Sequence, residues 1–362
     1  MPNARCPRTK RRLSATAATA AVLALAACSA GNGRAPQTPG PDVSTAALSE
    51  PETISTGLQS PWSIAFLDST PLVSERDSGR ILEIDREGNQ REAGVINAQG
   101  RGEGGLLGIA VQDGYFYSYL TAGDENRIER RELRGAPGSL SLGEPQPVLS
   151  GIPAGPVHNG GRIAFGPDGM LYATAGDAGD RDSAQDTQSL SGKILRLRPN
   201  GGVPGDNPFP GSPVFSYGHR NPQGLAWDGE GRLYASEFGQ NTWDELNIIE
   251  AGGNYGWPEA EGMANRDGFI DPVQQWDPAE ASPSGIAVLG DSVFVANLRG
   301  ERLREIPLAD TAAAVEHLPD YGRLRDAVAA PDGSLWLLTN NTDGRGSPGP
   351  DDDRILRIVL DR

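Results

Sequence analysis

The chain has 362 residues, including 48 glycines and 29 prolines, and a formal net charge of −16. This length is enough for one large domain or two small ones, and the glycine and proline content favours many short strands joined by turns. The acidic balance argues against a nucleic-acid partner, because phosphate binding requires clustered positive charge. After residue 30, no stretch of the sequence is long and apolar enough to span a membrane.

The N-terminus has the pattern of a targeting segment. A basic head at residues 5–12 precedes an apolar run at residues 15–27, which is too short for a spanning helix. The run leads into Leu-Ala-Ala-Cys, which ends at Cys28 and resembles a bacterial lipobox. We therefore predict a signal peptide over residues 1–27, a lipid on Cys28, and an exported protein anchored to the outer face of the cytoplasmic membrane, at the cell surface or in the periplasm. The alternative is an ordinary signal peptide followed by an incidental cysteine.

The segment after the predicted cleavage site has a different composition. Residues 28–50 are rich in Gly, Pro, Ser, Thr and Ala, which is typical of a flexible tether. From residue 51 onwards, one three-strand pattern recurs six times. Each copy begins with an apolar strand, continues through a turn that contains Asp or Gly, and adds two further strands. The equivalent apolar positions lie 45, 54, 62, 61 and 41 residues apart: Ile64, Ile109, Ile163, Leu225, Ile286 and Ala327.

Repeats of short strands at this spacing are typical of propeller blades, which bury their faces only by stacking in a ring. We therefore predict an all-β fold, a six-bladed β-propeller, as one domain over residues 51–362. A β-sandwich is the alternative, but it would not repeat one pattern six times. The longest extra segments, residues 178–192 and 198–217, are predicted to be loops, and the acidic run at residues 351–353 a solvated loop. The predicted strands, copy by copy, are 62–66, 72–75 and 81–85; 107–111, 116–120 and 127–133; 161–165, 171–175 and 193–197; 223–227, 233–237 and 245–250; 284–288, 293–297 and 303–308; and 325–329, 335–339 and 354–360.

Eight short motifs, in register with these copies, carry a specific resemblance. The chain resembles the soluble aldose sugar dehydrogenases that use pyrroloquinoline quinone (PQQ), the glucose/sorbosone dehydrogenase family, over nearly all of residues 55–360. The resemblance implies a six-bladed propeller that oxidises aldoses to lactones with PQQ and Ca²⁺ and passes electrons to an external acceptor. The motifs are Gly102-Glu-Gly-Gly-Leu-Leu-Gly108, His158-Asn-Gly-Gly-Arg162, Gly192-Lys-Ile-Leu-Arg196, Gly218-His-Arg-Asn-Pro-Gln-Gly224, Asp244-Glu-Leu-Asn247, Gly253-Asn-Tyr-Gly-Trp-Pro258, Leu298-Arg-Gly300 and Gly322-Arg-Leu-Arg-Asp326.

The candidate catalytic residues come from two of these motifs. Oxidising an anomeric hydroxyl removes a proton and a hydride, and the proton needs a base that is neutral near pH 7. His158 matches the family's catalytic histidine, which implies a general base; the alternative is a histidine that only hydrogen-bonds a loop. Arg220 and Asn221 match residues that contact the reactive quinone, where a cation stabilises the developing negative charge. An ion pair with a neighbouring acid is the alternative for Arg220, and His219 is expected to lie behind the site.

The candidate cofactor residues are mostly arginines, which suit a flat tricarboxylate because they are planar and always charged. Arg299 aligns with the family's cofactor lysine, and Arg323 and Arg325 align with its two cofactor arginines, for which a solvated rim pair is the alternative. Trp276 matches a tryptophan near the cofactor and substrate, or else it anchors a loop. Glu103 stands where some members have glutamine. A carboxylate beside the cofactor is unfavourable unless it is protonated, turned away or bound to a metal.

The resemblance also implies a calcium ion that bridges the quinone to the backbone carbonyls of Gly239 and Gln240. Oxygen ligands suit calcium. The chain departs from the family pattern here, because Phe238 stands where a polar residue is frequent and Gln240 where proline is common. These departures concern the shape of the metal site and not its backbone chemistry.

Three functions remain open on the sequence alone. The first is an exported oxidoreductase that takes an aldose, PQQ, calcium and an unidentified electron acceptor, and contacts the membrane only through its N-terminal lipid. No Gly-x-Gly-x-x-Gly fingerprint opens a strand–helix unit in this sequence, which counts against NAD. The second is a calcium-dependent lactonase, because similar propellers host different chemistries. The third is a non-catalytic propeller that binds a sugar or a protein.

Overall fold

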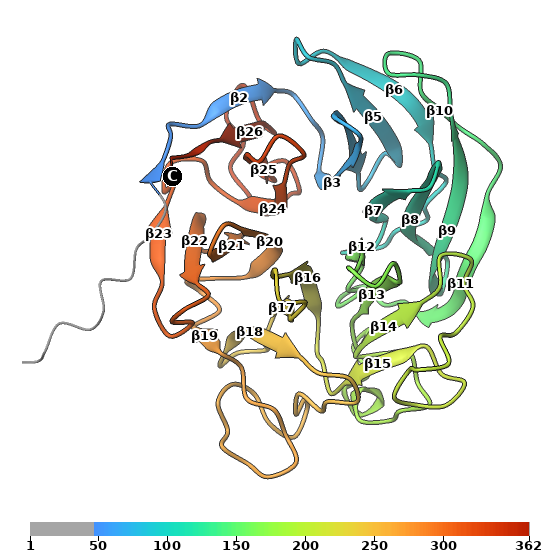
Figure 1. Cartoon of the computed structure of the whole chain (residues 1–362), viewed down its shortest axis with the longest axis vertical. Helices are drawn as coiled ribbons and strands as arrows, with labels where there is room; N and C mark the ends of the chain where they lie inside the picture. Colours follow the sequence, from blue (N-terminus) through green and yellow to red (C-terminus); the bar gives the residue numbers. More distant parts are fainter. Residues whose placement is uncertain (1–46, 362) are drawn as a thin grey trace, which may run out of the picture. The chain divides into compact units, whose positions relative to one another are not determined.

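Each of the six predicted copies forms an antiparallel sheet, and the six sheets are arranged as blades around a central channel in the computed structural model (Figure 1). The all-β, six-bladed β-propeller prediction is thus confirmed. The structure describes residues 47–361. The predicted signal peptide, Cys28 and most of the predicted tether lie outside the described residues. Among residues 47–361, no helix is long and apolar enough to cross a membrane.

The blades follow one another in chain order. Blade 1 contains β3 (Pro61–Leu67), β4 (Thr70–Glu75), β5 (Arg80–Ile84) and β6 (Gln90–Val95); blade 2 contains β7 (Leu106–Gln112), β8 (Tyr115–Ala122), β9 (Glu125–Arg134), β10 (Ser141–Leu142) and β11 (Gln146–Pro153). Blade 3 contains β12 (Ile163–Phe165), β13 (Leu171–Ala175), β14 (Lys193–Leu197) and β15 (Val214–Tyr217), with the 3₁₀ turn η1 (Arg181–Ala184) between β13 and β14; blade 4 contains β16 (Pro222–Trp227), β17 (Leu233–Glu237), β18 (Asp244–Ile249) and β19 (Gln274–Trp276). Blade 5 contains β20 (Pro283–Leu289), β21 (Ser292–Asn297), β22 (Arg302–Pro307) and β23 (Val315–His317); blade 6 contains β24 (Leu324–Ala329), β25 (Leu335–Thr339), β26 (Ile355–Ile358) and β2 (Glu52–Ser55).

The outermost strand of each blade is the part that the sequence pattern did not predict. The three inner strands agree with the predicted segments to within a few residues at each end. Residues 198–217, predicted as a loop, contain the outer strand β15, so that prediction is wrong for their last part. Outer strands such as β23, whose side chains are exposed or half-buried, cover a blade from one side only. They therefore lack the apolar signal that marks the inner strands.

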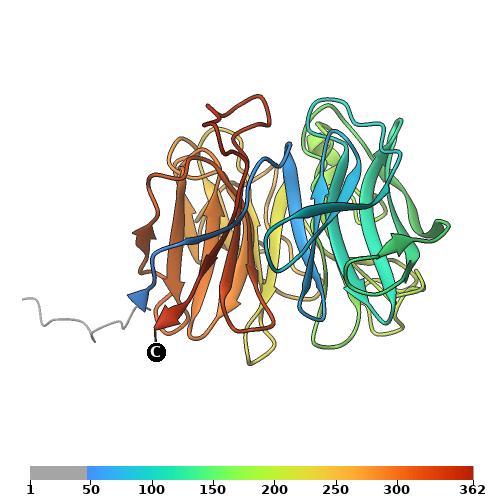
Figure 2. The same ribbon diagram turned by 90° about the horizontal axis from the view of Figure 1, so that it is seen from above.

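The ring is closed by strands from the two ends of the described chain. β2 pairs antiparallel with β26 and completes blade 6, with Thr53 opposite Leu356. β1 (Ala47–Leu48) pairs with β27 (Leu360–Asp361) beside it. Figure 1 shows this closure, where the blue β2 lies against the red β26, and Figure 2 shows the strands running between two faces of loops. By pairing with β26, strand β2 covers an edge of blade 6 that would otherwise be exposed.

The hydrophobic core is divided into six clusters, and each lies between two neighbouring blades. Strand β25 shows how the sequence produces this pattern. Leu335 and Leu337 face blade 5, whereas Trp336 and Leu338 face blade 1, because successive side chains of a strand point to opposite faces. Both faces of an inner strand are therefore buried, and the strand is apolar throughout.

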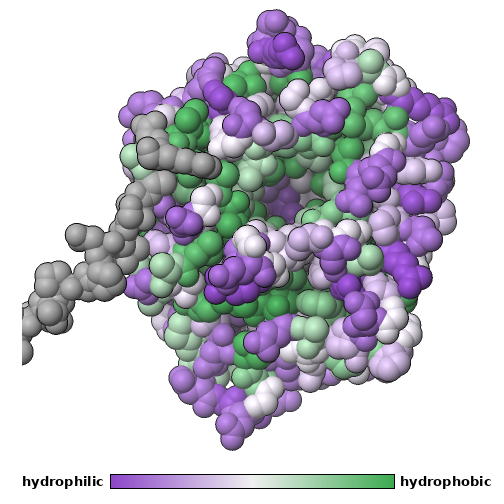
Figure 3. Space-filling model, in the orientation of Figure 1, coloured by the Kyte–Doolittle hydropathy of each residue, from purple (hydrophilic) through white to green (hydrophobic). Residues whose placement is uncertain are grey.

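The innermost strands line the channel. The C-terminal ends of these strands, with their recurring apolar pairs such as Ile-Ala, surround a cavity of about 480 Å³. Figure 3 shows a hollow at the centre of the face drawn, with hydrophobic side chains around it. Close approach of these strands requires glycine: a Cβ on Gly224 would lie 2.4 Å from the carbonyl oxygen of Ser284 in the next blade. The buried pair Arg162–Asp326 (2.9 Å) also lines this cavity and joins blades 3 and 6.

Candidate active site

A second, smaller cavity lies at the other end of the innermost strands, where they begin. All six blades contribute residues to its lining, either from the start of the innermost strand or from the turn that follows the second strand. Its volume is about 20 Å³, which is room for roughly one water molecule. The lining residues are Trp62, Arg76, Glu103, Asn159, Gly160, Gln223, Phe238, Leu298, Arg325 and Arg345.

His158 lies just before the innermost strand of blade 3 and is paired with Asp177. Its Nδ1 atom is 2.7 Å from Oδ1 of Asp177, which is fully buried. Asp177 also accepts hydrogen bonds from the backbone N–H of Gly179 and from Nε1 of Trp257, both at 2.8 Å. Burial alone would raise the pKa of Asp177, but the hydrogen bonds from these three partners outweigh it, so that the pKa lies below its usual value. An ionised Asp177 accepts a hydrogen bond from the Nδ1–H group of His158, which leaves Nε2 as the ring nitrogen able to take a proton.

Arg220 and Asn221 enter the site from the start of blade 4. The Nη1 atom of Arg220 donates to the carbonyl oxygens of Phe238 (3.1 Å) and Gly239 (2.6 Å), whereas its buried Nε has no hydrogen-bond partner. Asn221 accepts a hydrogen bond from the backbone N–H of Gly160 at 3.0 Å, which ties blade 4 to the turn that carries the histidine. The cation and the base therefore reach the same end of the channel from adjacent blades.

His219 is completely buried next to Arg220 and does not reach the cavity. Its Nδ1 lies 2.8 Å from Glu237 and its Nε2 lies 2.8 Å from the hydroxyl of Ser216. Its ring stacks on Tyr255 with 4.7 Å between the ring centroids. With both ring nitrogens engaged and no exposed surface, it supports the Arg220 turn and does not face the cavity, as the sequence indicated.

The arginines of blade 6 form a crowded positive cluster. Arg325 is buried, donates from Nη1 to Gln223 and Ser284 (both 3.2 Å), and has an unpartnered Nε. Arg323 is also buried; its Nη2 pairs with Asp343 at 3.1 Å and its Nε is likewise unpartnered. Burial, together with repulsion from the nearby Arg76, lowers the pKa of Arg325 to about 9. Unpaired buried donors in a positive field fit a polyanionic ligand.

Comparison with known proteins agrees with this geometry. Residues 58–357 match the family described as Glucose / Sorbosone dehydrogenase. The chain belongs to this family. Family membership makes it an oxidoreductase of the PQQ-dependent aldose sugar dehydrogenase type, and the sequence resemblance is confirmed at that level.

Several glucose/sorbosone dehydrogenase relatives are similar over most of the chain. The PQQ-bound aldose sugar dehydrogenase of Streptomyces coelicolor is 51% identical, with a TM-score of 0.84 over 88% of this chain and 99% of that one. An oxidoreductase (glucose dehydrogenase) of Thermus thermophilus is 40% identical, with a TM-score of 0.79 over 86% and 100%. The aldose sugar dehydrogenase of Escherichia coli K12 is 29% identical over 81% of this chain and 90% of its own. A gluconolactonase of Xanthomonas campestris, 15% identical with a TM-score of 0.51, shares the fold alone.

Glu103, the residue that departs from the glucose/sorbosone dehydrogenase pattern, lies at the edge of the cavity. Burial would raise its pKa, but the backbone N–H of His158 and the guanidinium of Arg345 hold the pKa below its usual value. The carboxylate is thus ionised and faces the cavity lining, and its charge is balanced by Arg345 at 2.8 Å. Pairing with a cation is a solution that the sequence analysis did not consider.

The predicted calcium ligands are only partly arranged as a metal site. The carbonyl of Gly239 accepts a hydrogen bond from Arg220, and Gln240 lies exposed with its N–H donated to Glu261. Asp244 stabilises this turn by accepting a hydrogen bond from the N–H of Gly239 at 2.8 Å. Among residues 47–361, no group of three or more His, Cys, Asp or Glu side chains is placed to hold a metal ion. The Gly239 carbonyl already accepts a hydrogen bond from Arg220, and it is therefore not a free metal ligand in this structure.

Two predicted cofactor residues, Trp276 and Arg299, do not line the small cavity. Trp276 ends the outer strand β19, where its ring packs in the core between blades 4 and 5 and lies 5.2 Å from the guanidinium of Arg304. The contact of Trp276 with the cofactor stays a prediction. Arg299 lies exposed in the turn after β21, next to Leu298, which lines the cavity. Its side chain is at the rim, whereas Arg323 and Arg325 are inside.

Four residues of the site were missed by sequence reasoning: Arg76, Asp177, Trp257 and Arg345. Arg76 and Asp177 share one signal, because both lie in the turn that follows the second strand of a blade. Arg76 comes directly after β4, as Phe238 and Leu298 do after their strands, and Asp177 comes two residues after the end of β13. Trp257 was assigned to a turn and packing motif, but its N–H fixes Asp177. Aligning the ends of the second strands would have found the first two.

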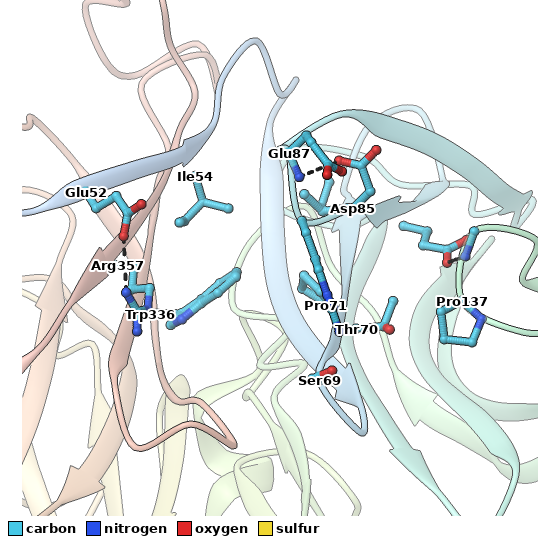
Figure 4. Close-up of a pocket in the computed structure, with 14 residues that line it drawn as sticks. Glu52, Ile54, Ser69, Thr70, Pro71, Asp85, Glu87, Pro137, Trp336 and Arg357 are labelled. Atoms are coloured by element: carbon cyan, nitrogen blue, oxygen red, sulfur yellow. Dashed lines mark hydrogen bonds and ion pairs between the residues drawn. The ribbon is translucent and has the colours of Figure 1, made fainter.

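A larger cavity of about 510 Å³ lies between blades 1 and 6, away from all of these residues. Figure 4 shows Ile54 and Trp336 on the blade 6 side and Pro71 on the blade 1 side. Its arginine Arg357 is already paired, with Glu52 and with Asp332. The smaller cavity is the better candidate although it is smaller, because it is lined by Asn159 and Gly160, which follow His158, and by Arg325, which has an unpartnered Nε.

Proposed function

We propose that the protein oxidises the anomeric hydroxyl of aldose sugars to lactones, with PQQ as the oxidant, and passes the electrons to a separate acceptor. The observation that carries this proposal is the His158–Asp177 pair beside buried arginine donors that lack partners. The PQQ-bound relative, 51% identical, supports the choice of cofactor. Two features of the structure support the proposal: a histidine paired with a carboxylate, and buried arginines that could bind a carboxylated quinone.

His158 is proposed to act as the general base. Its Nε2 takes the proton from the anomeric hydroxyl, while Asp177 accepts the Nδ1 hydrogen bond and stabilises the imidazolium that results. As the O–H bond breaks, the carbonyl of the lactone forms and the hydrogen on the same carbon leaves with its electron pair. PQQ, when bound, supplies the acceptor for that hydride. Asp177 stays ionised throughout, because its pKa is already below the usual value.

The arginine cluster is proposed to hold the cofactor. Arg323 and Arg325 would pair with its carboxylates through the Nε donors that have no partner, and Arg299 at the rim would add a further cation. Arg220, with its free Nε, would stabilise negative charge on the quinone oxygens, and Asn221 would orient the same edge. Because the cavity now has room for about one water molecule, side chains over it must move when the cofactor enters.

Calcium belongs to the proposal on the family resemblance, with the carbonyls of Gly239 and Gln240 as its protein ligands. Oxygen donors suit it, but the ion would have to displace the Arg220 hydrogen bond to Gly239. PQQ titrations with Ca²⁺ and with a chelator check this step. Affinity lowered by the chelator and restored by Ca²⁺ is the expected result; equal affinities would remove calcium from the proposal.

Export and lipid attachment at Cys28 are likewise proposed from the sequence, because these residues lie outside the described part. Cells fed labelled palmitate should label the wild-type protein in the membrane fraction and leave Cys28→Ala unlabelled. Label on Cys28→Ala, or a wild-type protein that is fully soluble, would support an ordinary signal peptide instead.

Reconstitution tests the function itself. Purified apoprotein, given PQQ and Ca²⁺, should reduce an artificial dye with a panel of aldoses, and the activity should disappear in His158→Ala. Lactone hydrolysis without PQQ binding would favour the lactonase, which at present rests on a shared fold alone. Sugar or protein binding without dye reduction would favour a non-catalytic propeller.

A further inference from the structure

An ion pair spans the mouth of the small cavity. Glu103 lies in the turn before β7 of blade 2, and Arg345 lies in the segment after β25 of blade 6. Although they are 242 positions apart in the chain, Nη2 of Arg345 is 2.8 Å from Oε1 of Glu103. Both side chains line the cavity, and Glu103 is 25% exposed whereas Arg345 is 59% exposed. The pair therefore closes the cavity on its solvent side.

The other oxygen of Glu103 holds the backbone of the proposed base. Oε2 accepts a hydrogen bond from the N–H of His158 at 2.9 Å, and the carbonyl of His158 accepts one from Ala178 at 3.1 Å. His158 has a φ of 56°, in the left-handed region that non-glycine residues rarely adopt. The two hydrogen bonds keep the residue in this conformation, from which its ring reaches Asp177.

The segment that carries Arg345 is also bound to the arginine cluster. Asp343 accepts a hydrogen bond from the N–H of Arg345 at 2.9 Å through Oδ1, and it pairs with Arg323 at 3.1 Å through Oδ2. The side chain of Asp343 is almost completely buried. A continuous chain of contacts therefore runs from Arg323, through the blade 6 segment and Glu103, to His158.

We propose that Glu103 is a positioning residue for His158, and that Arg345 neutralises its carboxylate so that a tricarboxylate can occupy the cavity beneath. This inference rests on the proposed function, because the tricarboxylate is PQQ. Without Arg345, an ionised carboxylate would face the incoming carboxylates and repel them, in a site partly screened from water. With Arg345, the same carboxylate keeps its hydrogen bond to the base at no net charge.

The two roles respond to different substitutions. Glu103→Gln keeps an oxygen acceptor for the N–H of His158 but removes the charge, whereas Glu103→Ala removes both. Arg345→Gln leaves the carboxylate without its cation. If Arg345 acts by neutralising Glu103, then removing the charge of Glu103 must repair the defect caused by Arg345→Gln; if Arg345 instead bound PQQ directly, the double variant would be no better than the single one.

Each substitution has its own expected effect. Arg345→Gln weakens PQQ binding about tenfold, and Glu103→Gln/Arg345→Gln recovers to within about threefold of the wild type. At saturating PQQ, Glu103→Gln keeps kcat within about threefold, whereas Glu103→Ala lowers kcat about tenfold or more with little change in KM for the sugar, because the base is displaced. Arg357→Gln, which removes an ion pair on the outer edge of blade 6, serves as the matched control and changes neither quantity.

PQQ affinity is measured by quenching of tryptophan fluorescence in the full-length apoprotein with Ca²⁺ present, and kcat by dye reduction. A double variant that binds PQQ as weakly as Arg345→Gln overturns the neutralising role. A Glu103→Ala variant with wild-type kcat overturns the positioning role; should it fail to fold, Glu103→Ser is measured in its place. A wild-type protein that does not bind PQQ at all would overturn the proposed function and this inference together, whereas binding that is equal in every variant would overturn the inference alone.

Discussion

At the scale of single residues, Asp177 determines how His158 can act. It is fully buried and accepts three hydrogen bonds, one of them from the histidine ring. A buried carboxylate is stable only when it is paired and hydrogen-bonded. Because its partners lower its pKa, Asp177 remains an acceptor and fixes which ring nitrogen of His158 is free.

Replacing Asp177 by asparagine should therefore disable the base without emptying the cofactor site. The amide cannot stabilise an imidazolium, and it can present an N–H to Nδ1 and so favour the wrong tautomer. We expect kcat to fall by about a hundredfold or more, with PQQ affinity within about threefold of the wild type. Steady-state kinetics at saturating PQQ check this, and a variant with wild-type kcat would contradict the assigned role.

Asp177 should also make the free energy of unfolding depend on pH in the acidic range. Its folded-state pKa lies below the unfolded value of 3.8, so its contribution to stability is complete above that value and is lost as the pH falls through the lower folded pKa. Urea denaturation of the wild type and of Asp177→Asn at pH 7, 5 and 3 measures this contribution. The difference in unfolding free energy should be similar at pH 7 and 5 and smaller at pH 3; a difference that is constant with pH would count against an ionised Asp177.

At the scale of elements, the segment of residues 178–192 is held by a buried lysine. The ammonium of Lys193 donates to the carbonyls of Ser183 and Ala184, both at 2.9 Å, and to that of Ser191. Lys193→Met leaves these carbonyls unsatisfied in a buried place and should cost about 2–4 kcal/mol of unfolding free energy. Chemical denaturation measures the cost, and limited proteolysis should cut first within residues 178–192. A loss below about 0.5 kcal/mol would show that the segment does not depend on this cation.

The acidic run at residues 351–353 shows an element that the sequence misrepresented. The prediction of a solvated loop is wrong for Asp353, which is fully buried. Asp353 accepts hydrogen bonds from the hydroxyl of Thr339 and from the backbone of Asn341 and Thr342. It thereby anchors the segment that carries Arg345. Three consecutive acidic residues indicate a solvent-exposed loop when only the composition is considered. The fold shows that one of them accepts hydrogen bonds from buried backbone groups.

At the scale of the whole molecule, the ring depends on its closure by β2. Without this strand, blade 6 would expose an unpaired edge and part of the core that contains Leu58 and Trp336. A chain that begins at residue 57 should melt roughly 5–10 °C below one that begins at residue 47. Calorimetry on both chains checks this prediction, and equal melting temperatures would mean that the ring does not need β2.

The architecture could be predicted from the sequence because the innermost strands repeat one apolar pattern and both of their faces are buried. The outer strands could not, because many of their side chains meet solvent and the apolar pattern fades, as in β6 and β23. The site residues that lie within motifs, such as His158 and Arg220, were found. Asp177 was missed because it meets His158 only when two turns of blade 3 come together, and Arg345 because its contact with Glu103 joins two blades.

Reduction of bound PQQ in a single turnover tests the central claim, that His158 and the arginine cluster together form a PQQ-dependent base site. Holoenzyme is mixed with one equivalent of an aldose, and the cofactor absorbance is followed for the wild type and for His158→Gln. The wild type should reduce its PQQ rapidly, whereas His158→Gln should bind PQQ with unchanged affinity and reduce it at least about a hundredfold more slowly. Reduction by His158→Gln at the wild-type rate would contradict this mechanism.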